Sequence, residues 1–277
     1  MRPLPREQSA TSTRPLALIT GASSGLGAEF ARQLAAQGYD LILTARRADR
    51  LATLAAELKR AANAHCSLVA ADLAEPAAVL SLIEAVKADG RPLAMLVNNA
   101  GYGVPGAYLS QPWQVHADFQ QVMVGAVAAL CFHVAPMMRQ HGRGTIVNVS
   151  SLAGHMPGSA GHTLYGPAKA WLIRFSECLD AELAPHGVRV TALCPGFTYT
   201  EFHDANGMRP RVSRLPRWLW MDAPTVVRQG LQAAAKGKTV HIPGLINKTL
   251  ALAARLLPQR LLTSAVASRA ADFRKVD

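Results

Sequence analysis

The chain has 277 residues, of which 50% are hydrophobic and 17% are charged, and its formal net charge is +11 at pH 7. This length suits one domain of the larger kind, with ample apolar material for a core. The positive charge gives little support for nucleic-acid binding, because the sequence lacks a basic face with interleaved aromatic residues.

The polar, proline-containing residues 1–14 predict a flexible tail ahead of one folded domain at 15–277. This tail lacks the apolar stretch of a secretory signal. No segment is expected to span a membrane, because Arg255 and Pro258 interrupt the most apolar one. The cysteines lack metal-site spacing, so we expect reduced core thiols, no metal and a cytoplasmic protein. They are Cys66, Cys131, Cys178 and Cys194.

Residues 15–20 form an apolar run that ends in a glycine-rich turn, and a helical pattern follows over 28–37. Backbone N–H groups of such a turn approach a pyrophosphate closely, and the dipole of the following helix favours the negative charge. We therefore expect a dinucleotide site formed by Gly21, Ser24, Gly25, Leu26 and Gly27.

Apolar strands alternate with helical patterns along the rest of the chain. This alternation implies a parallel sheet with helices on both faces. We predict strands near 16–20, 40–44, 66–71, 94–98, 144–149, 188–194 and 238–242. The fold class is therefore α/β.

The second predicted strand ends in Arg46 and Arg47. An enzyme that prefers NAD would be expected to offer an acidic residue to the ribose diol at this point. Arginine instead suits a 2′-phosphate through charge-assisted, forked hydrogen bonds. NADP(H) is thus expected in preference to NAD(H), the alternative being that both arginines are solvated at the start of the next helix.

Tyr165 and Lys169 are four residues apart, which places them on one face of a helix. A nearby ammonium favours the phenolate, so we expect Lys169 to lower the tyrosine pKa from its usual value near ~10. Pro167 between them is tolerated if the helix begins close to Tyr165. The pair can then transfer a proton to or from a carbonyl oxygen.

Five segments follow one another in the chain: Thr20-Gly21-x-x-x-Gly25-x-Gly27, Asn98-Asn99-Ala100-Gly101, Ser151, Tyr165-x-x-x-Lys169 and Pro195-Gly196. Together they resemble the successive signatures of the short-chain dehydrogenase/reductase family. The resemblance covers roughly residues 15 to 200, and within the family the chain is similar to the compact single-domain branch. It implies a three-layer Rossmann fold with a doubly wound, mainly seven-stranded parallel sheet, and an NADP(H)-dependent oxidoreductase.

The resemblance also implies the roles of individual residues. Tyr165 is the acid/base, Lys169 also holds the nicotinamide ribose, and Ser151 polarises the carbonyl, with Ser150 as the alternative serine. The Ser151–Tyr165 spacing is one residue longer than the family pattern, which indicates an insertion within 152–164. Further cofactor contacts are expected from Asp72 and Leu73 at the adenine, Asn99 at its ribose, Ala100 and Gly101, and Pro195, Gly196, Phe197 and Thr198 at the nicotinamide edge.

One position departs from the family pattern. Met123 stands where the family places an asparagine that helps hold a water in the proton relay beyond the lysine. A methionine side chain cannot hold such a water, so the relay would use the backbone carbonyl, Gln120 or Gln121, or be absent. Met123 can also simply pack in the core. An NADP(H)-binding sensor or interaction protein with weakened catalysis is therefore the alternative function.

The segment at about 198–222 predicts a lid over an apolar pocket. It carries Phe202, Trp218, Trp220 and Met221, and Tyr102, His155 and Met156 are candidates for the opposite wall. The expected substrate is an apolar ketone, aldehyde or secondary alcohol. The sequence does not specify which compound this is.

Positive charge is concentrated after residue 200, where 13 Lys and Arg face 5 Asp and Glu. Amphipathic helices are predicted at about 245–272, with an apolar stripe of Ile246, Leu250, Ala253, Leu257 and Leu261. This surface packs on the sheet or a partner subunit, or it makes peripheral contact with anionic lipid. By family analogy a homodimer or homotetramer is expected through the helices at 119–141 and 164–185.

Overall fold

Seven short apolar runs form the strands of one parallel sheet. The structure, a computed structural model, describes residues 13–104, 106–158, 160–161, 163–202, 213 and 215–258. Within them the sheet has the order β3-β2-β1-β4-β5-β6-β9, with every pair parallel. Its strands are β1 (Leu16–Thr20), β2 (Asp40–Ala45), β3 (Cys66–Ala70), β4 (Leu93–Asn98), β5 (Gly144–Val149), β6 (Val188–Leu193) and β9 (Val240–His241). The predicted doubly wound Rossmann fold is confirmed.

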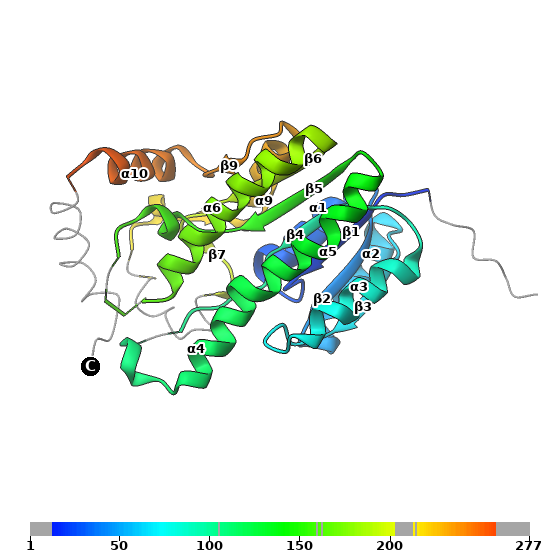
Figure 1. The fold of residues 1–277 in the computed structure, drawn as a ribbon, viewed down its shortest axis with the longest axis horizontal. Coiled ribbons are helices and arrows are strands. Elements are labelled where there is room, and N and C mark those ends of the chain that lie inside the picture. Colours follow the sequence, from blue (N-terminus) through cyan, green and yellow to red (C-terminus); the bar gives the residue numbers. More distant parts are fainter. Residues whose placement is uncertain are drawn as a thin grey trace, which may run out of the picture.

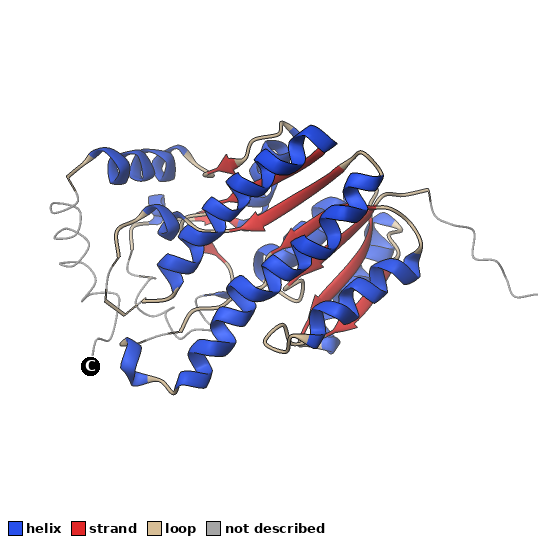
Figure 2. Cartoon of the chain, in the orientation of Figure 1, coloured by secondary structure: helices blue, strands red, loops and turns tan. Residues whose placement is uncertain are grey.

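Helices cover both faces of this sheet (Figures 1 and 2). Side chains alternate along β1, so that Leu16 and Leu18 enter one core cluster whereas Ala17 and Ile19 enter the other. The first cluster lies under α3 (Ala77–Asp89), α5 (Ala126–Gln140) and α6 (Tyr165–Leu183). The second lies under α1 (Gly25–Ala36), α2 (Ala48–Ala62) and α9 (Ala223–Ala235).

The strand order reverses between β1 and β4, which are neighbours in the sheet. The chain moves outward from β1 through β2 to β3, and then crosses back to continue from β4 in the other direction. Loops after the carboxyl ends of β1 and β4 therefore diverge and leave a crevice, which is where ligands bind in open α/β sheets. Both predicted cofactor motifs, the glycine turn and the segment after Asn98, lie at this crevice.

A long helical segment precedes β5. It consists of α4 (Trp113–Gln120), a π-helical turn (Gln121–Gly125) and α5. By length and composition the 28 residues Trp113–Gln140 could cross a membrane, because an 18-residue window within them has a mean hydropathy of 1.7, so the expectation that no segment qualifies was wrong. Half of that apolar stretch is buried, and Leu130 and Val134 lie in the core under the sheet. We assign it as a core helix.

The helix in the C-terminal third differs from the sequence prediction in its described extent and in its buried face. α10 (Leu245–Leu256) is described, whereas the predicted continuation from residue 259 lies outside the described residues, as do residues 1–12. The face that α10 buries carries Asn247 and Ala251, not the predicted stripe, whose Ile246 and Leu250 are each 39% exposed. Asn247 faces inward because it packs against Gly196, where an added Cβ would overlap its side-chain amide, and its amide donates to the Pro243 carbonyl at 2.9 Å.

The first and last residues of the predicted lid segment are described, and they pair with each other. β7 (Thr198–Tyr199) pairs in parallel with β8 (Met221–Asp222), and the Tyr199 and Trp220 rings stack at 4.8 Å between centroids. A short 3-10 turn, η5 (Arg217–Leu219), precedes β8. Residues 203–212 and 214, at the centre of the lid region, lie outside the described residues.

The four cysteines occupy different environments. Cys131 and Cys194 are buried and Cys66 is half-buried, whereas Cys178 is exposed on α6. The expectation of a core position was therefore wrong for Cys178. It lies on the solvent-facing side of an amphipathic helix whose apolar side, including Leu172 and Leu183, packs on the sheet.

Candidate active site

The turn between β1 and α1 excludes side chains at two glycines. Gly21 has a φ of +65°, and a Cβ added to it would lie 2.8 Å from the Cα of Ala100. A Cβ on Gly27 would overlap the carbonyl oxygen of Gly21. The first turn of α1 carries no acidic residue that would repel a phosphate. A pyrophosphate fits this turn because backbone can approach it closely and the helix dipole favours it.

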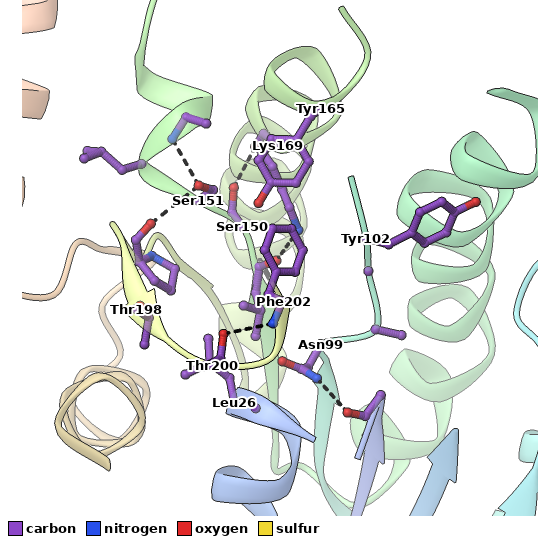
Figure 3. A pocket seen from close by; sticks show the side chains of 18 of the residues that line it. Leu26, Asn99, Tyr102, Ser150, Ser151, Tyr165, Lys169, Thr198, Thr200 and Phe202 are labelled. Atoms are coloured by element: carbon purple, nitrogen blue, oxygen red, sulfur yellow. Dashed lines mark hydrogen bonds between the residues drawn. The ribbon is translucent and has the colours of Figure 1, made fainter. Parts of the chain in front are cut away.

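Asn99, directly after β4, stabilises the glycine turn through hydrogen bonds. Its amide donates to the carbonyl oxygens of Thr20 at 3.0 Å and Gly21 at 3.2 Å (Figure 3). The Thr20 hydroxyl in turn accepts from the backbone N–H groups of Asn99 and Ala100, both at 3.0 Å. The side chain predicted to lie over the adenosine ribose therefore supports the turn, and Thr20 is a supporting residue that the site prediction omitted.

Two arginines follow β2 at the edge of the crevice. Arg47 donates to the hydroxyls of Ser23 at 3.0 Å and Ser24 at 2.9 Å, which ties it to the glycine turn. Arg46 has 71% of its side chain exposed and lies 3.8 Å from the Asp72 carboxylate. The guanidinium groups thus stand at the point where the ribose of a dinucleotide on this turn would lie.

The crevice is a cavity of about 1480 Å³. All predicted cofactor and catalytic residues line it except Gly27, which lies beneath the turn. The lining set contains Gly21, Ser24, Gly25, Leu26, Arg46, Arg47, Asp72, Leu73, Asn99, Ala100, Gly101, Ser151, Tyr165, Lys169, Pro195, Gly196, Phe197 and Thr198. One cavity therefore joins residues from both halves of the sheet.

Tyr165 and Lys169 begin α6 at the wall of this cavity. Burial raises the pKa of Tyr165 to about 12, and a hydrogen bond with Ser151 acts in the opposite direction. The Lys169 ammonium donates to the Val149 carbonyl at 2.8 Å and lies 5.7 Å from the centre of the Tyr165 ring. Burial lowers the pKa of Lys169 to about 8. The expected lowering of the tyrosine pKa by Lys169 is not found here, because desolvation raises this pKa and outweighs the opposing effect of Ser151.

The two candidate serines have different partners (Figure 3). Buried Ser150 donates its hydroxyl to the Lys169 carbonyl at 2.7 Å, which fixes the start of α6. The Ser151 hydroxyl accepts from the Ala153 N–H at 3.1 Å, and its interaction with Tyr165 acts to lower the pKa of that phenol. Ser151 is also held against the end of β6, because its hydroxyl lies 3.5 Å from the Pro195 carbonyl. Ser151 is the serine that reaches the tyrosine.

The cofactor-facing loop after β6 is tied to the loop after β5. The Pro195 carbonyl accepts the backbone N–H of Leu152 at 2.8 Å, in addition to the Ser151 hydroxyl. The Ser150 N–H donates to the Leu193 carbonyl at 2.7 Å. These bonds continue the pairing of β5 and β6 into the site.

Met123 lies behind the site in the π-helical turn. It is 2% exposed and packs with Phe119 and Ala168. A Cβ on Gly101 would lie 2.8 Å from the Met123 sulfur, which shows how closely the side chain fills this space. The space is apolar, as expected for a methionine packed in the core.

The part of the cavity beyond Tyr165 is mainly apolar. The Phe202 ring lies 5.9 Å from the Tyr165 ring, and Trp218 with 62% exposure lines the opening. Tyr102 and Met156 line the cavity as predicted, whereas His155 is absent from its described lining. α10 also contributes Leu250 to this wall, a residue that the apolar stripe of the sequence placed on a packing or lipid-facing surface and not in the cavity.

Known proteins share both the sequence pattern and this architecture. The family model described as short chain dehydrogenase matches residues 15–209. The chain belongs to the short-chain dehydrogenase/reductase family. It is 35% identical to the short-chain reductase protein NovJ of Streptomyces niveus over 251 residues, 89% of each chain. It is 37% identical over 189 residues to serine 3-dehydrogenase of Agrobacterium fabrum, covering 67% of this chain and 72% of that one.

Solved members of the family have the same fold. A short-chain dehydrogenase from Sphingobium yanoikuyae in complex with NADPH has a TM-score of 0.78 and 34% identity, covering 86% of this chain and 91% of that chain. The bulky-bulky ketone specific alcohol dehydrogenase from Comamonas testosteroni has a TM-score of 0.74 and 30% identity, covering 90% and 96%. This short-chain dehydrogenase is accordingly an oxidoreductase that binds a nicotinamide cofactor and acts on a small molecule.

Proposed function

We propose that the protein is an NADP(H)-dependent reductase or dehydrogenase for apolar ketones, aldehydes or secondary alcohols. The convergence of Ser151, Tyr165 and Lys169 at one wall of the cavity, with Lys169 one helical turn along α6 and Ser151 acting to lower the pKa of Tyr165, is the observation that carries this proposal. All three line the same cavity as the glycine turn. A carbonyl group beside Tyr165 would therefore lie within reach of a cofactor bound on that turn.

Each group has a distinct proposed role in carbonyl reduction. When bound, the reduced nicotinamide supplies the hydride that reduces the carbonyl carbon. Tyr165, with its pKa raised to about 12, is protonated at neutral pH and gives its proton to the oxygen. Ser151 donates to the same oxygen as negative charge develops there. Lys169 stabilises the phenolate that remains, and the reverse reaction uses the same groups in reverse order.

The substrate side of the proposal rests on the apolar wall formed by Phe202, Trp218 and Leu250. A solved relative with specificity for ketones carrying two bulky groups gives it further support. NADPH oxidation against a panel of small and bulky ketones and aldehydes tests it. Faster turnover of bulky apolar carbonyls is expected, and a preference for small charged carbonyls would contradict this substrate class.

Preference for NADP(H) is proposed from Arg46 and Arg47. Replacing both by serine should weaken NADPH binding about 10- to 100-fold, because charge-assisted hydrogen bonds contribute roughly 1.5–3 kcal/mol. NADH lacks the 2′-phosphate, so its binding should change little. Fluorescence titration of both cofactors measures the effect, with Arg174→Gln as control, since Arg174 is exposed and pairs with Glu177 on α6. Equal NADH and NADPH affinity in the unmodified protein would contradict the preference.

The reduction rate should fall above a pH of about 8. Lys169, whose pKa burial lowers to about 8, loses above that pH the charge that stabilises the Tyr165 phenolate. We expect kcat/KM to be level below this pH and to decrease about tenfold per pH unit above it. Lys169→Arg keeps its charge, so its profile should lack the decrease. The same decrease in that variant would refute the assignment to Lys169.

A nucleotide-binding sensor is the second candidate function, and Met123 is the observation that favours it. Its buried, apolar side chain leaves no side-chain ligand for a relay water at this position. Saturable NADPH binding without turnover of any carbonyl in the panel would favour the sensor. Turnover that depends on Tyr165 would exclude it.

Assembly and location are proposed on surface properties. Exposed Phe132 on α5 and Trp113 on α4, 74% and 64% accessible, suit a homodimer or homotetramer in the cytoplasm. Exposed Leu252 and Leu256 of α10 beside Arg255 suit a partner subunit or, alternatively, peripheral contact with anionic lipid. Light scattering and sedimentation with anionic liposomes separate these alternatives.

A further inference from the structure

Three consecutive residues after β7 cross the mouth of the cavity. Thr200 covers the glycine turn, since a Cβ on Gly25 would lie 3.3 Å from the Thr200 Cβ. The Phe202 ring lies 5.9 Å from the Tyr165 ring (Figure 3). Between them, Glu201 also lines the cavity. Its carboxylate therefore stands at the entrance, close to the proposed cofactor site.

Glu201 is paired with the arginines at the start of α2. Its Oε2 atom accepts from Nη1 of Arg50 at 2.6 Å and lies 3.7 Å from Nη1 of Arg47. The side chains are 53% exposed for Glu201, 45% for Arg47 and 43% for Arg50. Both guanidinium groups thus share one carboxylate oxygen at a site that a ligand can reach from solvent.

Arg47 links this ion pair to the glycine turn. Its second terminal nitrogen, Nη2, donates to the hydroxyls of Ser23 and Ser24, at 3.0 Å and 2.9 Å. One guanidinium therefore contacts the turn on which a dinucleotide would lie and the carboxylate of Glu201. A 2′-phosphate bound by Arg47 would come close to that carboxylate.

We propose that Glu201 determines how strongly the protein prefers NADP(H) to NAD(H), because its carboxylate competes with the 2′-phosphate for Arg47 and Arg50. A phosphate monoester carries about −1.5 to −2 charge at pH 7, so it repels the carboxylate and binds the same donors. The ribose of NAD(H) carries no such group and leaves the ion pair intact. This inference rests on the proposed function and identifies a residue that tunes its cofactor choice.

Arg50, which pairs with Glu201, also becomes a ligand of the 2′-phosphate in this proposal. Its partner in the structure is Glu201, and it lies in the first turn of α2, beyond the two arginines that the sequence identified. When the phosphate displaces the carboxylate, the Arg50 guanidinium becomes available to it. Arg50 is thus a third phosphate ligand that the preference requires.

Glu201→Gln is the direct test, with dissociation constants for NADPH and NADH measured by fluorescence titration. The variant should bind NADPH about two- to five-fold more tightly, the range that one exposed ion pair supports, and NADH without change. The gain should shrink at raised salt, because screening weakens exposed charges. Arg50→Gln should weaken NADPH binding only, and the effects of the two substitutions should not add.

Glu57→Gln is the matched control. Glu57 is 40% exposed and pairs with Arg32 at 2.7 Å, so the substitution removes a comparable ion pair outside the cavity. It should leave both dissociation constants unchanged. Unchanged NADPH binding in Glu201→Gln, or an equal gain for NADH, would overturn the inference.

The outcomes also separate this inference from the proposed function. If Glu201→Gln tightens NADPH selectively but no carbonyl is reduced, the inference holds and the proposed reaction fails. If carbonyls are reduced and Glu201→Gln binds both cofactors like the unmodified protein, the reaction holds and the inference fails. A protein that binds neither cofactor contradicts both.

Discussion

Tyr165→Phe should lower kcat for carbonyl reduction about 10²- to 10⁴-fold, the usual contribution of a positioned general acid. The substitution removes the proposed proton donor and leaves the ring that packs near Phe202. The apolar shape of the site is therefore kept, and the NADPH dissociation constant should change less than about twofold. Steady-state rates and fluorescence titration on the same protein sample measure the two effects.

Tyr102→Phe provides the control for this prediction. Tyr102 also lines the cavity, and burial raises its pKa to about 12, so it is chemically comparable. Its ring makes an edge contact with Phe119, and the phenylalanine ring can keep this contact. The control should retain most of its activity. Retained turnover in Tyr165→Phe, or an equal loss in Tyr102→Phe, would refute the role of Tyr165.

Gly27→Ala should have the second large effect, on both stability and cofactor binding. The added methyl overlaps the Gly21 carbonyl oxygen and forces the glycine turn to move. Overpacking of this kind costs about 1–3 kcal/mol of folding free energy. A displaced turn should also weaken NADPH binding at least about tenfold, equal to roughly 1.4 kcal/mol. Denaturant unfolding and cofactor titration measure the two quantities.

The backbone of Gly27 has no positive φ, so alanine is acceptable there apart from the overlap. In a helix alanine is favoured over glycine by about 1 kcal/mol. This gain partly offsets the steric cost, so the measured loss of folding free energy is smaller than the cost of the overlap. Gly158→Ala is the control, because a Cβ at that position meets nothing within 4 Å. A Gly27→Ala variant as stable as the unmodified protein, with unchanged NADPH affinity, would show that the turn is not constrained as described.

The sheet was predictable because each strand is a short apolar run between glycine or polar residues. β1 and β4 are buried on both faces by helices, so their sequences are almost wholly apolar. The start of α6 at Tyr165 also follows from local sequence, since Pro167 fits only the first turn of a helix. Local propensity and burial are sufficient for these elements.

Contacts between distant segments were not predictable in the same way. Arg50 and Glu201 are 151 residues apart, and no periodicity in the chain relates them. The direction of the Tyr165 pKa shift depends on how deeply α6 is packed, whereas its spacing from Lys169 suggests only attraction. The buried face of α10 carries Asn247, which packs against the distant Gly196, and an apolar stripe cannot reveal such a contact.

The two bonds that converge on the Pro195 carbonyl have a consequence for how the site responds to substrate. They join the loop carrying Ser151 to the loop expected beside the nicotinamide, so the two move together. Aligning the Ser151 hydroxyl with that loop costs conformational entropy, and this entropy is lost when the chain folds and not when the substrate binds. Substrate binding then requires little rearrangement of these groups, and most of its binding energy can act on orienting the carbonyl.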